Sequence, residues 1–275
     1  MCRWAQVSRS GYYSWRDRPL SQTACRREEL GILIEWCFHD SEETYGYRRI
    51  TAQLARMGVH CDPQTVRGVM QERGLVACQP RRRARTTVPA NDVDTRPDRV
   101  QRSFTAEAPG MRWVGDITYI STWEGFIYLA TVLDCYSKKV VGYAMADHMR
   151  TSLVSDAIQM AVRRCRTVRG ETVFHSDRGS QYTSAEFAEV LSGLGLLASV
   201  GRTGSCYDNA WAESFNATLK NERVHRTVYP TKKRAVADVT SWIELRYNQK
   251  RLHSGLGYCT PNEVEADWFT TQTAV

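Results

Sequence analysis

Apolar and polar positions follow two different rhythms along the chain, and the first rhythm is helical. Between residues 43 and 77, two short runs repeat apolar residues every three or four positions, which is the spacing of one helix face. Asp62 stands where the second run needs a cap, while Gly58 and Gly74 stand where the two helices would end. The pattern therefore predicts a helix-turn-helix-like segment at 43–77, within a helical N-terminal region at 1–78.

From position 111 onward the rhythm is that of strands, which later alternate with helices. Three apolar runs rich in β-branched and aromatic residues come first, at 113–120, 126–133 and 140–145. They are followed by a helix at 152–164, a strand at 172–176, a helix opened by Thr183 and Glu186 as a capping box, a strand at 197–200, and a helix capped by Asp208. Because turns join the first strands and helices join the later ones, this order predicts an α/β fold with a mixed five-stranded sheet and flanking helices.

The same patterns divide the rest of the chain into segments. Residues 79–105 have no apolar periodicity and contain several prolines and arginines, which is typical of a basic linker. The strand-rich part with a C-terminal extension then occupies 106–265, and a short tail follows at 266–275. Ligands of such sheets bind at strand ends, so we expect the functional site there.

Composition limits the class of protein. The 275 residues are 42% hydrophobic, enough for a sizeable core, and no stretch approaches the roughly 18 apolar residues of a membrane span. Nine cysteines are scattered and odd in number, no CxxC occurs, and the histidines lack the spacing of a zinc finger. We therefore expect a cytoplasmic protein with reduced thiols, no membrane contact and no structural zinc site.

The positive charge is concentrated in the front third of the chain. The formal net charge is +7; residues 1–105 hold 18 Arg, no Lys and 12 acidic residues, whereas residues 106–275 hold 19 basic and 18 acidic residues. Guanidinium groups bind phosphate oxygens in a fork, so this distribution favours contact with nucleic acid. A solvated surface that serves only solubility is the alternative that charge alone leaves open.

Three acidic residues of the strand-rich part are candidates for chemistry. Asp116 lies inside the first predicted strand, where an unpaired carboxylate is costly and needs a partner or a metal. Asp177 follows the fourth strand at a strand end, and Glu213 lies on the last helix with 35 residues between them. Taken singly, each has a structural explanation, such as ion pairing for Asp116 and a turn for Asp177.

The segments around these acids resemble the three acidic motifs of the retroviral-integrase superfamily. They read WVGDITYI, HSDRGSQYTS and NAWAESFNATLK. More narrowly, they resemble the OrfB-type transposases of the insertion-sequence-three family. The segments YGYRRITAQL and YNQKRLHSGLGYCTPNE also look like this family, so the resemblance covers most of residues 43–263. Three motifs in order at the family's interval, with two flanking signatures, make it specific. Retroviral integrases carry a zinc-binding domain before the core, which an arginine-rich helical region replaces here.

The resemblance implies a ribonuclease-H-like fold and an enzyme that cleaves DNA at transposon ends and joins the 3′-hydroxyl to another phosphodiester. It also implies that Asp116, Asp177 and Glu213 form a DDE carboxylate triad that holds two divalent metal ions, Mg²⁺ or Mn²⁺, with Asp116 bridging both. Such hard cations prefer oxygen ligands, and a pair of them activates the attacking oxygen and stabilises the leaving one. Few acids are needed because water and phosphate complete the coordination.

Candidate DNA contacts fall in three places. They are Arg48, Arg49, Gln64 and Arg67 in the helix-turn-helix-like segment, Arg81, Arg82, Arg83 and Arg85 in the linker, and Asn216 and Lys220 on the last helix. We expect the linker arginines to hold phosphates without reading bases, with a solubilising tether as the alternative. Asn216 and Lys220 lie three and seven residues beyond Glu213, on its face of the helix, where a solvated stripe is the alternative.

Other polar residues receive structural interpretations. Asp134, at the end of the second strand, is expected to make structural hydrogen bonds because the family does not count this position in its triad. His175 and His253 are not assigned as general bases, since a metal lowers the pKa of bound water or hydroxyl without one. Packing against the catalytic domain and contact with DNA stay equally open for Tyr247, Asn248, Arg251 and His253.

The expected partners are double-stranded DNA, at transposon ends and target, and further copies of the chain assembled on it at the bacterial nucleoid. The predicted recognition helix offers few polar readers of base edges. We therefore expect an upstream-encoded N-terminal DNA-binding protein, fused by frameshifting or supplied separately, to provide most of the discrimination. Two other functions compete: a repressor with a dead centre, which the intact triad disfavours, and a nuclease that shares the metals but joins no strands.

Overall fold

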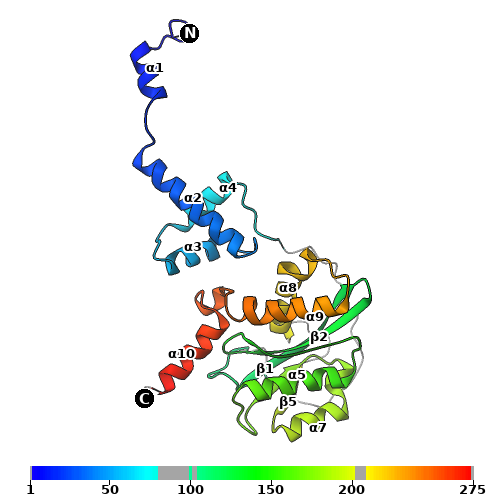
Figure 1. Cartoon of the computed structure of the whole chain (residues 1–275). Coiled ribbons are helices and arrows are strands. Elements are labelled where there is room, and N and C mark those ends of the chain that lie inside the picture. The colour runs from blue at the N-terminus through cyan, green and yellow to red at the C-terminus, as the bar shows by residue number, and fades with distance from the viewer. Residues whose placement is uncertain (1, 80–98, 101–103, 202–208, 274–275) are drawn as a thin grey trace. The chain divides into compact units, whose positions relative to one another are not determined.

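The structure, a computed structural model, describes residues 2–79, 99–100, 104–201 and 209–273. It divides into two units, Met1–Cys78 and Gln79–Val275 (Figure 1). Most of the linker expected at 79–105 lies outside the described residues, and with it lie Arg81, Arg82, Arg83 and Arg85.

The first unit is helical. Its elements are α1 (Arg9–Arg16), α2 (Gln22–Asp40), α3 (Tyr47–Arg56) and α4 (Pro63–Glu72). Helices α2, α3 and α4 pack on one another around a small apolar core that includes Ile34, Ile50, Leu54 and Val66, whereas α1 buries no residue.

Helices α3 and α4 are the two helices expected at 43–77. Asp62 caps α4 as predicted, because its carboxylate accepts hydrogen bonds from the N–H groups of Gln64 and Thr65. After the helices, Gly58 and Gly74 have φ angles of 81° and 66°, in the left-handed region that favours glycine.

The second unit is built on a five-stranded sheet. Its strands are β1 (Arg112–Thr122), β2 (Gly125–Asp134), β3 (Val140–Ala146), β4 (Val173–Ser176) and β5 (Leu197–Val200). They lie in the order β3-β2-β1-β4-β5, in which β1–β2 and β2–β3 are antiparallel while β1–β4 and β4–β5 are parallel. The predicted mixed sheet is thus confirmed, since turns join the first three strands and helices carry the chain to the last two.

Helices cover both faces of this sheet, α5 and α7 on one and α8 and α9 on the other (Figure 1). The elements are α5 (Thr151–Arg164), α6 (Ser180–Thr183), α7 (Ala185–Gly193), α8 (Ala210–Glu222), η2 (Val224–Arg226), α9 (Lys232–Ser241), η3 (Trp242–Tyr247), η4 (Ser254–Leu256) and α10 (Pro261–Thr273). Each face has its own apolar core. Helix α5 approaches β3 so closely that a Cβ at Gly142 would lie 2.2 Å from the carbonyl oxygen of Ala157.

Two predicted helix starts differ from the structure. Thr183 belongs to the short α6, where its hydroxyl donates to the carbonyl of Gly179, so Ser184 instead caps α7 by accepting the N–H of Phe187. Asn209 takes the N-cap position of α8 without a side-chain cap bond, and Asp208, predicted there, lies outside the described residues. None of the described helices is long and apolar enough to cross a membrane.

Candidate active site

Asp116 lies in the middle of β1, the central strand of the sheet. It is paired with Thr131 of β2, and its side chain is partly buried. Its Oδ1 accepts the N–H of Ile117 at 2.8 Å, and its Oδ2 accepts the side-chain amide of Asn216 at 2.8 Å. The carboxylate is therefore held from its own strand and from helix α8.

Asp177 follows the last residue of β4 and is exposed. Because β1 and β4 are parallel, with Gly115 opposite Ser176, Asp177 comes level with Asp116 on the neighbouring strand. The N–H of Gly179 donates to its Oδ1 at 3.0 Å, which holds the carboxylate against the turn that begins α6. This is the strand-end position that the sequence indicated.

Glu213 lies in the first turn of α8 and is exposed. The opposite side of the helix is anchored in the core by Ala212, Phe215 and Leu219. The start of the helix is tied to β1, because the side-chain amide of Asn209 donates to the carbonyl of Gly115 at 3.2 Å. Helix α8 thus carries Glu213 three residues before Asn216, which bonds to Asp116.

The electrostatics of Asp116 indicate that the three acids share one neighbourhood. The pKa of Asp116 is raised to about 7, first by burial and then by the charge of Asp177, with a smaller contribution from Glu213, against the hydrogen bonds from Ile117 and Asn216. The pKa of the buried Tyr182 is also raised, first by burial and then by the charges of both aspartates. Among the described residues, no three His, Cys, Asp or Glu side chains are gathered closely enough to hold a metal ion.

Two asparagines shape this site in ways that sequence reasoning did not predict. Asn209 and Asn216 are both buried, and each uses its amide nitrogen to hold β1. Their Oδ1 atoms have no hydrogen-bond partner within the part of the chain that the structure describes. The spacing of Asn216 from Glu213 placed both on one helix face and so indicated that Asn216 belongs to the site. The role expected for it was a DNA contact, not a bond to Asp116.

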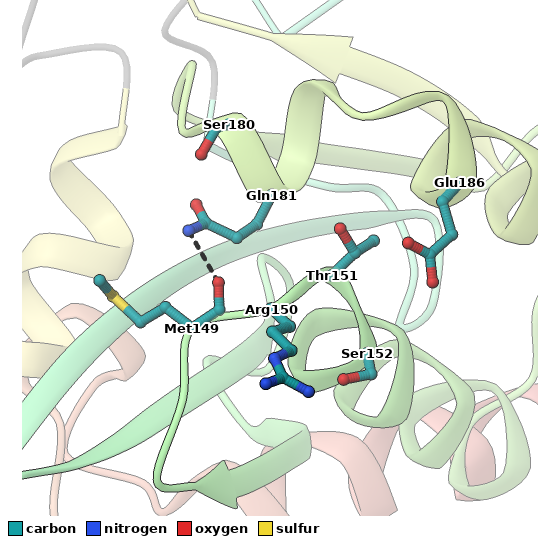
Figure 2. Close-up of a pocket in the computed structure, with 7 residues that line it drawn as sticks. All are labelled: Met149, Arg150, Thr151, Ser152, Ser180, Gln181 and Glu186. Atoms are coloured by element: carbon teal, nitrogen blue, oxygen red, sulfur yellow. Dashed lines mark hydrogen bonds between the residues drawn. The ribbon is translucent and has the colours of Figure 1, made fainter.

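A pocket of about 370 Å³ lies beside the Asp177 turn, where the start of α5 meets α6 and α7 (Figure 2). It is lined by Met149, Arg150, Thr151, Ser152, Ser180, Gln181 and Glu186. Figure 2 shows the side chain of Gln181 directed at Met149, whose carbonyl accepts its amide at 2.9 Å. Its lining of one arginine, one glutamate and several hydroxyl groups was not foreseen, because its segments are far apart in the sequence.

Among the other predicted DNA contacts, four belong to the first unit. Arg48, Gln64 and Arg67 are exposed and Arg49 is partly exposed. The ring of Tyr47 joins two of them across α3 and α4, with the guanidinium carbon of Arg48 at 5.6 Å and that of Arg67 at 5.9 Å from its centroid. In the second unit, Nζ of Lys220 lies 4.4 Å from the ring centroid of Tyr119.

Asp134 and His175 have the surroundings of structural residues. Asp134 is 1% exposed and accepts hydrogen bonds from the N–H groups of Gly110 and Ser137 and from the hydroxyl of Ser137. His175 is buried in β4 with its Nδ1 2.8 Å from Oγ of Ser199. Neither side chain faces solvent.

The C-terminal signature packs against the catalytic sheet. Arg251 forms a buried two-bond ion pair with Glu222 at the end of α8, at 2.7 and 2.8 Å. The ring of Tyr247 meets Phe215 of the same helix edge to face, with centroids 4.9 Å apart. Asn248 bonds to both backbone groups of Val140. The sequence left packing and DNA contact open for this segment, and the structure favours packing. The contacts of Arg251 and Tyr247 hold α8 in place.

Comparison with known proteins agrees with this architecture. The family described as "Integrase core domain" matches residues 106–206 and, through a second model, 194–261, and "HTH-like domain" matches 26–84. "Transposase InsF for insertion sequence IS3A" of Escherichia coli (strain K12) is 35% identical over 267 residues, 96% of this chain and 92% of the relative. The chain belongs to the IS3 family of transposases.

Other similarities fit this transposase as well. "Insertion element IS600 uncharacterized 31 kDa protein" of Shigella sonnei is 37% identical over 262 residues, covering 95% of the transposase and 96% of that protein. A simian T-cell lymphotropic virus intasome in complex with PP2A regulatory subunit B56 gamma shares the fold, with a TM-score of 0.50, 16% identity, and coverage of 78% of the transposase and 70% of that chain. The transposase is accordingly a polynucleotidyl transferase with an integrase-type core.

Proposed function

We propose that this transposase cuts DNA at transposon ends and transfers the cut strand to target DNA with Asp116, Asp177 and Glu213 as its DDE triad. The observation that carries the proposal is the placement of the acids: the sheet register brings Asp177 level with Asp116, and Asn216, three residues beyond Glu213 on α8, bonds to Asp116; the raised pKa of Asp116 agrees with it. Three carboxylates that repel one another have no structural benefit in a metal-free fold. Bringing their charges together is favourable only when cations neutralise them.

The donor set suits Mg²⁺ or Mn²⁺. Carboxylate oxygens are the preferred ligands of both, and the Oδ1 atoms of Asn209 and Asn216 are further buried oxygens without a partner among the described residues. Asp116, from its central position, is proposed to serve two ions, with Asp177 and Glu213 each completing one site. When bound, the ions supply charge neutralisation at the attacking and leaving oxygens of the phosphodiester.

The protein's own residues have positioning roles in this proposal. The amide of Asn216 fixes the rotamer of the Asp116 carboxylate, and the N–H of Gly179 fixes that of Asp177. The buried Arg251–Glu222 pair holds the far end of α8 and so limits movement of Glu213. No histidine is needed as a base, and the buried His175 is not placed to be one.

DNA is proposed to contact both units. In the first, Arg48, Arg49, Gln64 and Arg67 face the duplex, of which Arg48 and Arg67 share the Tyr47 ring. In the second, Lys220 beyond Glu213 and Arg150 in the pocket beside Asp177 are cations flanking the acids. Arg81, Arg82, Arg83 and Arg85, which lie outside the described residues, are proposed to add phosphate contacts. Assembly of several copies on DNA at the nucleoid, with an upstream-encoded partner for end selection, completes the proposal.

The decisive experiment is a strand-transfer assay on a mini-transposon. We expect cut ends and joined products with Mg²⁺ or Mn²⁺, and binding without product with Ca²⁺. Glu213→Gln is expected to give neither product yet bind DNA as before, because it removes a metal ligand and no cation. Glu189→Gln, which neutralises an exposed acid on α7, is the matched control and keeps both activities.

Each possible outcome separates the competing functions. Cutting without joining supports a plain nuclease, and binding without either product in Mg²⁺ or Mn²⁺ supports a repressor with a dead centre. Appreciable joining by Glu213→Gln contradicts the triad.

A second assay addresses end selection. The transposase alone is expected to prefer end-containing over scrambled duplexes only weakly at fixed salt. A preference of about a hundredfold, roughly 2.7 kcal/mol, would remove the need for an upstream partner.

A further inference from the structure

Helix α1 is a well-capped helix that packs on nothing in the described part of the chain. The hydroxyl of Ser8 caps it by accepting the N–H of Gly11, yet α1 buries none of its residues. It has eight residues, and isolated helices shorter than about 12–15 residues are marginal in water. A helix of this length therefore needs a surface to pack on, which a single copy of the chain does not supply.

One face of α1 combines aromatic rings with arginines. Tyr12, Tyr13 and Trp15 are exposed, Trp15 by 68%. The rings are in contact, because the centroid of Tyr12 lies 5.5 Å from that of Tyr13 and 6.0 Å from that of Trp15. Arg9 and Arg16 lie one turn before and one turn after Tyr12, on the same side of the helix. Trp, Tyr and Arg are the residues that dominate binding energy at protein interfaces. We call these five residues the α1 face.

The outer side of α2 is a second exposed surface, of opposite charge. Ile32 and Trp36, one turn apart, are 59% and 52% exposed, although the other side of the helix is buried. Glu29 and Asp40 continue the same side by one turn in each direction, and both are exposed. We call these four residues the α2 face. It has an acid at each end of an apolar centre, whereas the α1 face has a base on each side of an aromatic centre.

The two faces match in length and are large enough for an interface. Glu29 and Asp40 are eleven residues apart, about 16 Å along a helix, and Arg9 and Arg16 are seven apart, about 10 Å, a difference that the long arginine side chains cover. An aromatic side chain has roughly 150–250 Å² of surface, so the four half-exposed rings and Ile32 offer about 500 Å² per copy. Packing both faces of two copies then buries about 1,000 Å², which is what a specific interface needs.

A second copy of the chain is the occupant that covers both faces at once. Within one copy both faces stay exposed. Duplex DNA would attract the arginines of α1 but would leave the α2 face exposed, because Glu29 and Asp40 repel phosphates. A second copy offers an α2 face to the first α1 and an α1 face to the first α2. This two-fold exchange is self-complementary and closes at a dimer.

We propose that two copies of the chain exchange their α1 helices, with each α1 face packed on the α2 face of the other copy. The proposal goes beyond the function proposed above, because it needs neither DNA nor metal. It gives the transposase a dimer that forms before DNA is bound and that joins two helix-turn-helix-like segments in one particle.

The test is sedimentation equilibrium of the full chain, without DNA and with chelator, over a series of concentrations. We expect wild type to dimerise. Trp15→Ala and Trp36→Ala should each raise the dissociation constant of the dimer by at least about thirtyfold, the effect of losing an interface hot spot. Trp15→Ala is decisive even where Trp36→Ala disturbs folding, because α1 buries no residue of the single chain. Trp123→Ala removes a comparably exposed indole, 76% exposed on the second unit, and should leave the dissociation constant unchanged.

An exchange of charges separates contact between copies from contact within one chain. One variant carries Arg9→Glu with Arg16→Glu, and another carries Glu29→Arg with Asp40→Arg. Each variant alone has like charges on both faces and should stay monomeric. A mixture of the two should dimerise as wild type does, because every contact between them joins opposite charges.

The proposal is overturned by a monomeric wild type, by a dimer that survives Trp15→Ala, by a mixture of charge variants that stays monomeric, or by an equal loss in Trp123→Ala. A monomeric wild type in which Trp15→Ala weakens binding to duplexes of every sequence would assign α1 to DNA instead. Product formation in Mg²⁺ tests the triad and sedimentation tests this interface, so the failure of one leaves the other standing.

Discussion

Asp116 and Asp134 lie on neighbouring strands of the same sheet, yet their surroundings have opposite character. Asp134 accepts three hydrogen bonds, from Gly110 and from the backbone and hydroxyl of Ser137, and it is almost fully buried. Asp116 accepts two and faces two further acids. Burial is the largest cause of a raised pKa for both. The next-largest influence differs: the negative charge of Asp177 raises the pKa of Asp116 further, whereas hydrogen-bond donors lower the pKa of Asp134, which separates a candidate metal ligand from a structural acid.

The largest expected effect separates the two aspartates by activity. Asp116→Asn should reduce cleavage and joining by about a thousandfold or more, about 4 kcal/mol of activation free energy, because the carboxylate proposed to serve both metal ions is lost. Asp134→Asn should retain activity when rates are normalised to folded protein. Single-turnover cleavage of a labelled transposon end measures both. Equal loss in a folded Asp134→Asn protein would remove the distinction.

The second effect concerns stability, and here Asp134→Asn is expected to be the more damaging of the two substitutions. In Asp134→Asn one oxygen becomes an amide donor that faces buried N–H or hydroxyl donors, so at least one hydrogen bond is lost and donors stay unpaired. We expect a loss of about 2–3 kcal/mol in the free energy of unfolding, measured by urea denaturation followed by circular dichroism. Ser137→Ala, which removes one of the three donors, should cost about 1 kcal/mol. An unchanged denaturation midpoint in Asp134→Asn would contradict the structural role.

Much of this fold could be predicted because its strands are long apolar runs between turns. The run at 126–133 became β2 (Gly125–Asp134), and the run at 197–200 became β5 with the same bounds. Local chemistry was less decisive at helix starts. Thr183 and Ser184 are both good caps. Ser184 caps α7 because Thr183 belongs to the short α6, which follows the Asp177 turn and has no periodic signal in the sequence.

The site was predictable only in its charged members. Asp116, Asp177 and Glu213 were predicted from motifs that resemble those of the family, and the sheet register explains why strands β1 and β4 bring two of them level. The pocket beside Asp177 and the pairing of Arg251 with Glu222 join segments that are distant in sequence, so no local pattern reveals them. Asn216 was found, but its bond to Asp116 depends on how α8 packs on β1.

Asn216 offers a third, smaller way to sharpen the comparison. Asn216→Ala removes the amide that holds Asp116, and loss of a group that orients a metal ligand costs about tenfold or somewhat more in activity. We expect turnover to fall with little change in DNA affinity or in its salt dependence. A drop in affinity with unchanged turnover would instead support the direct DNA contact expected from the sequence. Asn216→Asp keeps the size of the side chain but adds a fourth acid, and should be less active than Asn216→Ala.

The smallest expected effect is a gain in stability from the substitution that abolishes activity. In chelated, metal-free protein Asp116→Asn removes a charge that burial, Asp177 and Glu213 all disfavour, so the free energy of unfolding should rise by about 1 kcal/mol after allowance for solvent screening. The sign follows from the raised pKa. The folded wild type holds a proton more tightly than the unfolded chain, so it loses stability as the pH rises from the ordinary value of 3.8 to about 7, and the variant does not. The difference should therefore be present at pH 8 and vanish near pH 4.

Added Mg²⁺ should stabilise wild type more than the variant, because only wild type keeps all three acids. A metal-free Asp116→Asn protein that is less stable than wild type at pH 8 would show that Asp116, like Asp134, serves the fold.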